Sequence, residues 1–283
     1  MAVDLIKQLR DETGVSVMDC KKALEKANND LEAAKVILKE EGLAKADKRA
    51  DRETKTPILF GYISADGKSG GVLELRCETD FVAKHEDFVN LGNTLVKEAV
   101  NQKPTDLANF LTKMIGTDSV ENTIKGVIAK FGEKMEIGHF NVISTTSGII
   151  ANYIHAGGKV GVLIEIGSES NLSIENEVIK SFSKDICMQI AAMNPKYITS
   201  NDIPSETMEF FKKEFSESVD MSKPEEIRSK ILDGKFAKKY EEICLMNQHF
   251  IKDDSKTIQA LVNEANSQNG IKLEIVKFFR YQN

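Results

Sequence analysis

The chain has 283 residues, 41% of them hydrophobic and 29% charged, and its net charge is −6. This length fits two domains, or one large domain with a small module. No stretch approaches the roughly 18 apolar residues of a membrane-spanning helix, and the acidic balance argues against broad binding to nucleic acid.

The N-terminus carries neither the basic and apolar segments of a secretion signal nor an Arg- and Ser-rich import sequence, so we expect a cytoplasmic protein that contacts no membrane. The four cysteines are scattered, which predicts reduced, mostly buried thiols. The four histidines show no metal-ligand spacing. We therefore expect no metal site and no cofactor.

Residues 1–42 have the pattern of three short helices. Gly14 ends the first because glycine adopts the left-handed conformation at low cost. Ser16 begins the second as its N-cap, and Gly42 ends the third. So small a bundle has a thin core, which is typical of a docking module.

Residues 43–56 contain almost no large apolar side chain, which indicates a solvated linker into which the third helix frays. A basic arm that binds nucleic acid is the alternative. It is disfavoured because Asp47, Asp51 and Glu53 alternate with the lysines and arginines.

From residue 57 the pattern changes to alternating strands. Residues 58–63 and 71–75 predict a hairpin, with Asp66-Gly67 in its turn. The glycines at 61 and 67 imitate a phosphate-binding loop, but their spacing is wrong and a strand follows where that loop requires a helix. Helices are expected at 80–99, 107–115 and 119–131, the last ended by Gly132, and a strand at 137–143.

The segment Thr79-Asp80-Phe81 joins the hairpin to the first of these helices. Thr79 or Asp80 is suited to cap that helix. Phe81 allows two interpretations: it belongs to the apolar face and packs in the core, or it projects outward into a partner.

The sequence around the hairpin occurs twice, at an offset of 91 positions (62 to 153). The repeat predicts two similar α+β halves. In the second copy Asn171-Leu172 replaces Asp80-Phe81, so the cap chemistry is kept and the aromatic ring is not. The matching positions are Tyr62 and Tyr153, Gly67 and Gly158, Lys68 and Lys159, Glu74 and Glu165, and Glu78 and Glu169.

Helices at 175–193, 206–219 and 225–233 follow the second hairpin. The last two have no counterpart in the first half, so we interpret them as an insertion. Their apolar face suits packing within a helical hairpin or a dimer contact. Alternating residues at 271–281 predict a final strand.

We therefore expect an α+β protein in five parts. These are a helical bundle (1–42), a linker (43–56), a first core subdomain (57–142), a second core subdomain (143–180 and 234–283) and a coiled-coil-like helical insertion (181–233). No nucleophile elbow, zinc-protease motif or dinucleotide-binding turn is present in the sequence. This organisation indicates a binding protein.

Four segments together resemble the bacterial translation elongation factor Ts family, in the order of that family. They are residues 9–14 (LRDETG), 18–24 (MDCKKAL), 79–83 (TDFVA) and 153–163 (YIHAGGKVGVL). The resemblance implies an N-terminal ubiquitin-associated-like bundle, a two-subdomain core and a helical insertion that dimerises.

The resemblance also implies a function, namely guanine nucleotide exchange on the GTPase elongation factor Tu without catalysis by this chain. It leaves open a homodimer or a heterotetramer with the GTPase. In the family, the phenylalanine matching Phe81 inserts between helices of the GTPase, and the aspartate matching Asp80 disturbs its Mg²⁺ and phosphate region. The positions implied to contact the GTPase are Thr79, Asp80, Phe81, Val82, Phe131, Gly132, His155, Val17, Met18 and Lys21.

Two alternatives differ in class from an exchange factor. One is an RNA-associated translation factor, which the acidic balance disfavours. The other is an enzyme that uses the loop of His155, Gly157 and Gly158, for which the sequence offers no partnered acid or nucleophile.

Two departures from the family concern residues 15–17 (VSV), where Ala-Gly-Met is more usual, and a C-terminal helical module that some members carry after the last strand.

Overall fold

The computed structural model describes residues 2–169, 172–173, 176–220 and 222–283. The N-terminal bundle consists of α1 (Ala2–Thr13), α2 (Val17–Lys26) and α3 (Leu31–Asp47). Ser16 caps α2 by accepting a hydrogen bond from the Asp19 amide, as the sequence predicts. Leu9, Cys20 and Leu24 lie at the centre of its small core.

The expected end of the third helix at Gly42 is wrong. α3 continues through Asp47, and Ala46 is buried in the core of the first half. A Cβ atom at Gly42 would lie 2.5 Å from the Cβ of Ala129 in α7 (Val120–Phe131), so glycine is required there for close packing of the two helices. The first residues of the predicted linker are therefore helical and packed.

The first half contains a three-stranded antiparallel sheet in the order β1-β2-β5. β1 (Thr56–Ile63) and β2 (Ser69–Cys77) form the predicted hairpin, and β5 (Met135–Ser144) pairs with β2. The helices of this half are α4 (Asp80–Ala83), α5 (Glu86–Gln102), α6 (Leu107–Thr112) and α7 (Val120–Phe131).

Two sequence predictions in this half need correction. The helix expected at 80–99 is two helices, α4 and α5. The helix expected at 107–115 ends at Thr112, because the next residues form a two-stranded ribbon of β3 (Met114–Ile115) and β4 (Asp118–Ser119). Ser119 caps α7 and Gly132 ends it at φ +75°, as expected.

The second half repeats this arrangement, with a sheet in the order β10-β7-β6. β6 (Ile149–Ile154) and β7 (Val160–Ser168) form the second hairpin, and β10 (Leu273–Gln282) is the predicted final strand. The sheet is covered by α8 (Glu177–Met193) and α11 (Ile258–Asn269). A short ribbon of β8 (His249–Phe250) and β9 (Asp253–Thr257) precedes α11.

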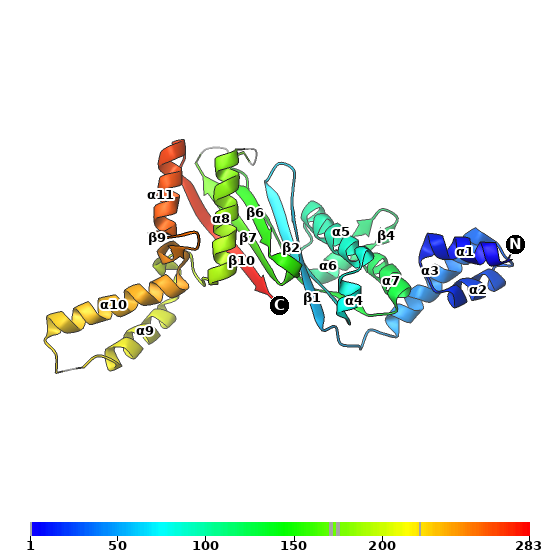
Figure 1. The fold of residues 1–283 in the computed structure, drawn as a ribbon, viewed down its shortest axis with the longest axis horizontal. Coiled ribbons are helices and arrows are strands. Elements are labelled where there is room, and N and C mark those ends of the chain that lie inside the picture. Colours follow the sequence, from blue (N-terminus) through cyan, green and yellow to red (C-terminus); the bar gives the residue numbers. More distant parts are fainter. Residues whose placement is uncertain (1, 170–171, 174–175, 221) are drawn as a thin grey trace.

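The two sheets pack face to face. Val72 of β2 and Leu163 of β7 lie in the cluster between the sheets, whereas their neighbours Leu73 and Ile164 point to the helices outside. This alternation follows from the two-residue period of a strand. The central body is thus four layers, helix–sheet–sheet–helix (Figure 1).

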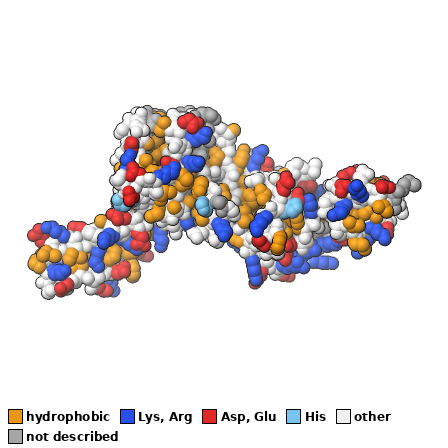
Figure 2. Space-filling model, viewed as in Figure 1, with side chains coloured by type: hydrophobic (Ala, Val, Ile, Leu, Met, Phe, Trp, Pro, Cys, Tyr) orange, Lys and Arg blue, Asp and Glu red, His pale blue; other side chains and the backbone are white. Residues whose placement is uncertain are grey.

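A helical hairpin of α9 (Ser205–Glu217) and α10 (Glu225–Ile243) projects from the body at the end opposite the bundle (Figure 1). Its apolar face packs within the chain, with Met208, Phe211 and Tyr240 against Ile243. The predicted boundaries at 180 and 234 both fall inside helices, because α8 packs in the second core and α10 runs through Ile243. Acidic and basic side chains are interspersed on the hairpin and on the bundle (Figure 2).

Candidate functional site: the Phe81 corner

α4 is a single helical turn that begins where β2 ends. The Thr79 hydroxyl accepts a hydrogen bond from the Val82 amide at 3.5 Å, so Thr79 is the N-cap. Val82 and Ala83 are buried in the first core and anchor the turn. Phe81 points away from them and is 83% exposed, the largest fraction among the large hydrophobic side chains that the structure describes.

The second copy of the repeat shows what this position does when it is structural. Leu172, which matches Phe81, is only 4% exposed and belongs to the second core. Interpretation of Phe81 as a core residue is therefore wrong, and the outward interpretation agrees with the structure. The predicted cap Asn171 lies outside the described residues.

A carboxylate from the end of α7 holds this turn in place. Glu133 accepts hydrogen bonds from the Thr79 hydroxyl at 2.8 Å and from the Thr79 amide at 3.1 Å. In the opposite direction, Glu78 accepts one from the Lys134 amide at 2.6 Å. The structure thus brings Thr79–Val82 together with Phe131 and Gly132. We call these residues, with Glu133 and His85, the Phe81 corner. Sequence reasoning missed Glu133.

The thiol beneath the turn is also engaged. The Cys77 Sγ donates to the Thr79 carbonyl oxygen at 3.1 Å. Burial raises the pKa of Cys77 to about 12, so the thiol is protonated at neutral pH. Cys77 is one of four free, buried cysteines, in agreement with the sequence prediction.

His85 separates α4 from α5. Its Nδ1 accepts a hydrogen bond from the Asp87 amide at 3.2 Å and so caps α5. The imidazole packs edge-on against the Phe131 ring, with 4.6 Å between centroids. His85 is a second residue of this corner that sequence reasoning missed, because histidine is not among the usual caps.

Asp80 places a negative charge beside Phe81. Its carboxylate lies 2.8 Å from the Lys84 Nζ, and this hydrogen bond lowers the pKa of Asp80. Both side chains are mostly exposed, so the ion pair is weak and another group can replace Lys84 as the partner of Asp80. Asp80 is therefore anionic at neutral pH.

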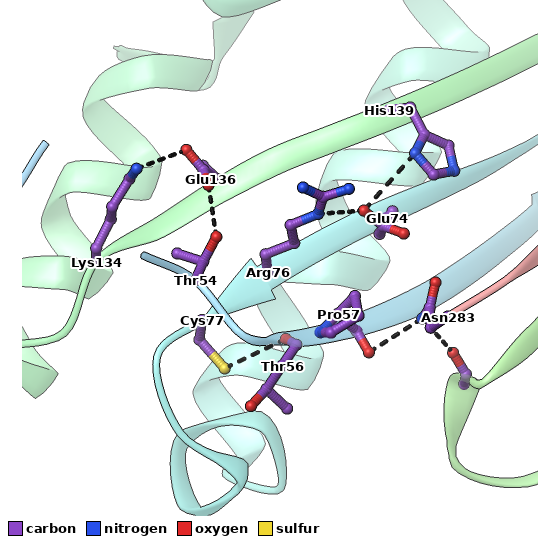
Figure 3. A network of polar contacts seen from close by, with 11 residues as sticks. Thr54, Thr56, Pro57, Glu74, Arg76, Cys77, Lys134, Glu136, His139 and Asn283 are labelled. Carbon is purple, nitrogen blue, oxygen red and sulfur yellow. Dashed lines mark hydrogen bonds and ion pairs between the residues drawn. The ribbon is translucent and has the colours of Figure 1, made fainter. Parts of the chain in front are cut away.

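His155 lies in the turn between β6 and β7, where the Tyr153 hydroxyl is 3.0 Å from its Nδ1. This turn is joined to β1 by the side-chain Nδ2 of Asn283, which donates to the carbonyl oxygen of Pro57 (Figure 3) and to that of Gly158. Pro57 pairs with Arg76 near the end of β2. His155 thus lies beside β1, and β1 pairs with β2, the strand that leads into α4.

The predicted contact residues of the bundle lie on a separate surface. Val17 and Met18 in the first turn of α2 are 47% and 60% exposed. Lys21, one turn later, lies 3.8 Å from the Glu25 carboxylate. α2 is at one end of the molecule, whereas α4 lies on the central body (Figure 1).

Several polar side chains near the end of β2 pair with one another. The buried Glu74 carboxylate pairs with the Arg76 guanidinium and lies 3.6 Å from His139, and Thr54 donates to Glu136 (Figure 3). Among the described residues no group of three or more His, Cys, Asp or Glu side chains is arranged to hold a metal ion. In the same part of the chain no helix is long and apolar enough to span a membrane.

The turn exposes a phenylalanine and an aspartate on a core built from two similar halves, an arrangement typical of a protein that binds another macromolecule. Comparison with known proteins specifies the class. The sequence model of a family described as elongation factor TS matches residues 78–283.

Curated relatives extend the match over nearly the whole chain. It is 35% identical to elongation factor Ts of Clostridium botulinum (strain Alaska E43 / Type E3) and 37% identical to that of Clostridium perfringens (strain SM101 / Type A), each time over 98% of this chain and 91% of the relative. It is 37% identical to elongation factor Ts of Clostridium kluyveri (strain NBRC 12016), over 100% of this chain and 92% of the relative. The chain belongs to the elongation factor Ts family, and so to the elongation factors of protein biosynthesis.

Proposed function

We propose that this chain is the guanine nucleotide exchange factor of elongation factor Tu, and that Phe81 acts as a wedge in the GTPase. The observation that carries the proposal is the contrast between Phe81, 83% exposed, and its buried twin Leu172. An exposed phenylalanine on a fixed turn gains stability only when a partner covers it. Covering such a ring contributes roughly 1.5–3 kcal/mol.

The wedge requires no covalent chemistry in this chain. A factor that binds the nucleotide-free GTPase better than the GDP-bound form must weaken GDP by the same ratio. Each ~1.4 kcal/mol of wedge binding that lowers the release barrier accelerates release about tenfold. This chain then acts as a binding partner, not as an enzyme.

Asp80 has a separate part in the proposal. Its carboxylate is anionic beside the wedge, and Lys84 is a weak partner that can be exchanged. When Phe81 inserts, that charge enters the region of the GDP phosphates and their Mg²⁺. Repulsion of the phosphates and competition for the cation both favour release.

The remaining predicted contacts extend this surface. We propose that His155 contacts the GTPase from the second half and that Val17, Met18 and Lys21 dock the bundle on the same GTPase. A cytoplasmic location follows from that partner. A homodimer or heterotetramer through the α9–α10 hairpin stays a prediction, as does the absence of direct nucleic-acid binding.

Release of fluorescent GDP from elongation factor Tu tests the proposal. We expect Phe81→Ala to slow stimulated release by about tenfold or more, since ~1.4 kcal/mol suffices. The melting temperature should not change, because the ring is exposed. Ile251→Ala is the control, since Ile251 is also an exposed apolar side chain and belongs to none of the predicted contact surfaces.

Two results would contradict different parts of the proposal. Stimulation by Phe81→Ala at the wild-type rate would exclude the wedge. Lack of stimulation by the wild-type protein would exclude exchange activity altogether, and co-purification with the GTPase and its nucleotide content would then define what the interaction does.

A further inference from the structure

The turn between α1 and α2 contacts a lysine of the core. Gly14 adopts φ +68°, and a Cβ atom there would lie 2.3 Å from the Cε of Lys130 and 2.8 Å from its Nζ. The side chain of Lys130, near the end of α7, therefore lies directly across this turn. Val17 and Met18 follow within one helical turn.

The other contacts of Lys130 lead to the Phe81 corner. Its Nζ lies 2.6 Å from the Asp87 carboxylate and 5.9 Å from the centroid of Phe131. Asp87 is also 3.3 Å from the Nδ1 of His85, which separates α4 from α5. One side chain thus joins the bundle to the residues that surround α4.

Helix α3 makes a second contact between the bundle and α7. Gly42 packs on Ala129, and ion pairs flank that contact, Lys39 with Asp118 at 2.6 Å and Lys125 with Asp47 at 2.7 Å. Because α3 and α7 touch along one line, this contact alone does not stop the bundle from tilting about that line. Lys130 lies away from it, at the α1–α2 turn.

Packing alone does not fill the space between the bundle and α7. A cleft of about 400 Å³ lies between them, lined by Thr13, Val15 and Leu38 on the bundle and by Asn122 and Val127 on α7. An open cleft gives the bundle room to tilt toward α7. The contact of Lys130 with the α1–α2 turn and Asp87 limits that motion.

We propose that Lys130 is a positioning residue. It fixes the exposed residues of α2 (Val17, Met18 and Lys21) relative to Phe81, so that both surfaces contact the GTPase in a preorganised arrangement. The inference rests on the proposed exchange function. Two contact surfaces held at a fixed spacing bind with a higher effective concentration than two that move independently. Lys130 raises affinity in this way without touching the GTPase.

The dependence of GDP release on factor concentration tests this role. With Lys130→Ala we expect the concentration for half-maximal release to rise about threefold to tenfold, while the maximal rate stays unchanged because Phe81 is intact. Lys130→Arg keeps the stem and the charge for Asp87 and should restore most of the affinity. Lys97→Ala, an exposed lysine on α5, is the control.

A double-mutant cycle with Met18→Ala shows whether the effect acts through the bundle. We expect Met18→Ala to weaken half-maximal release less in the Lys130→Ala background than in the wild-type background, because the loosened bundle contributes less. Spin labels at Glu25→Cys on α2 and Lys97→Cys on α5 measure the distance between the bundle and the core directly. The native cysteines are buried, so the labels react at the two new sites. Lys130→Ala should broaden their distance distribution.

Each alternative outcome is decisive. If the wild-type protein stimulates release and Lys130→Ala matches it at every concentration, the positioning role is wrong. If affinity falls without broadening of the distances, or if the two substitutions are additive, Lys130 contacts the GTPase itself and the inference is overturned. No release with the wild-type protein would instead overturn the proposed function.

Discussion

Glu133 makes the most specific contact of the Phe81 corner. Its two carboxylate oxygens accept from the amide and the hydroxyl of one residue, Thr79, which caps the turn that carries Phe81. Thr79 could be predicted as a cap because capping depends on neighbours in sequence. Glu133 could not, since it lies 54 positions further along the chain.

We expect Glu133→Ala to slow maximal GDP release by about tenfold. The substitution removes two hydrogen bonds to a charged group and leaves the Thr79 amide without its acceptor. The turn then loses the orientation that aims Phe81. Release at saturating factor measures this, with Glu241→Gln on α10 as control; a change confined to the melting temperature would show that Glu133 serves stability alone.

The division of one predicted helix into α4 and α5 is the main departure at the scale of an element. Phe81, Phe88 and Leu91 have the spacing of a continuous apolar face, yet Phe88 and Leu91 are buried and Phe81 is not. Periodicity cannot reveal a break that depends on a side-chain cap. The repeat contains the signal, because Asn176 occupies the position that matches His85 and caps α8.

Replacement of His85 by asparagine should therefore preserve the break. His85→Ala removes the acceptor for the Asp87 amide, and we expect a loss of about 1 kcal/mol of stability together with slower GDP release. His85→Asn supplies an equivalent oxygen and should recover the stability measured by urea unfolding. Equal stability of the alanine and asparagine variants would contradict a capping role.

At the scale of the whole molecule, the internal repeat predicts two similar halves but not how they pack. The inter-sheet cluster is built from both halves, with Leu59 and Val72 from the first and Ile150 and Leu163 from the second. Consecutive apolar residues such as Val72 and Leu73 point to opposite faces of a strand, so each sheet has two apolar faces. It does not show which face meets the other sheet and which meets the helices, because both are equally hydrophobic.

Neighbouring residues of β7 separate these two faces experimentally. Leu163 and Ile164 are both fully buried, but Leu163 packs between the sheets and Ile164 against the helices of the second half. Truncation of either to alanine should cost about 2–5 kcal/mol. In hydrogen exchange we expect Leu163→Ala to lower protection in β2 as well as in β7.

Ile164→Ala is the matched control, and it should lower protection mainly in β7 and α8. The difference matters for function because Phe81 belongs to the first half and His155 to the second, so their spacing depends on the cluster between the sheets. Leu163→Ala should therefore also raise the factor concentration needed for half-maximal GDP release more than Ile164→Ala does. Identical hydrogen-exchange patterns for the two variants would show that the two halves unfold as one unit whichever face is weakened. The inter-sheet cluster would then have no separate role in the spacing of Phe81 and His155.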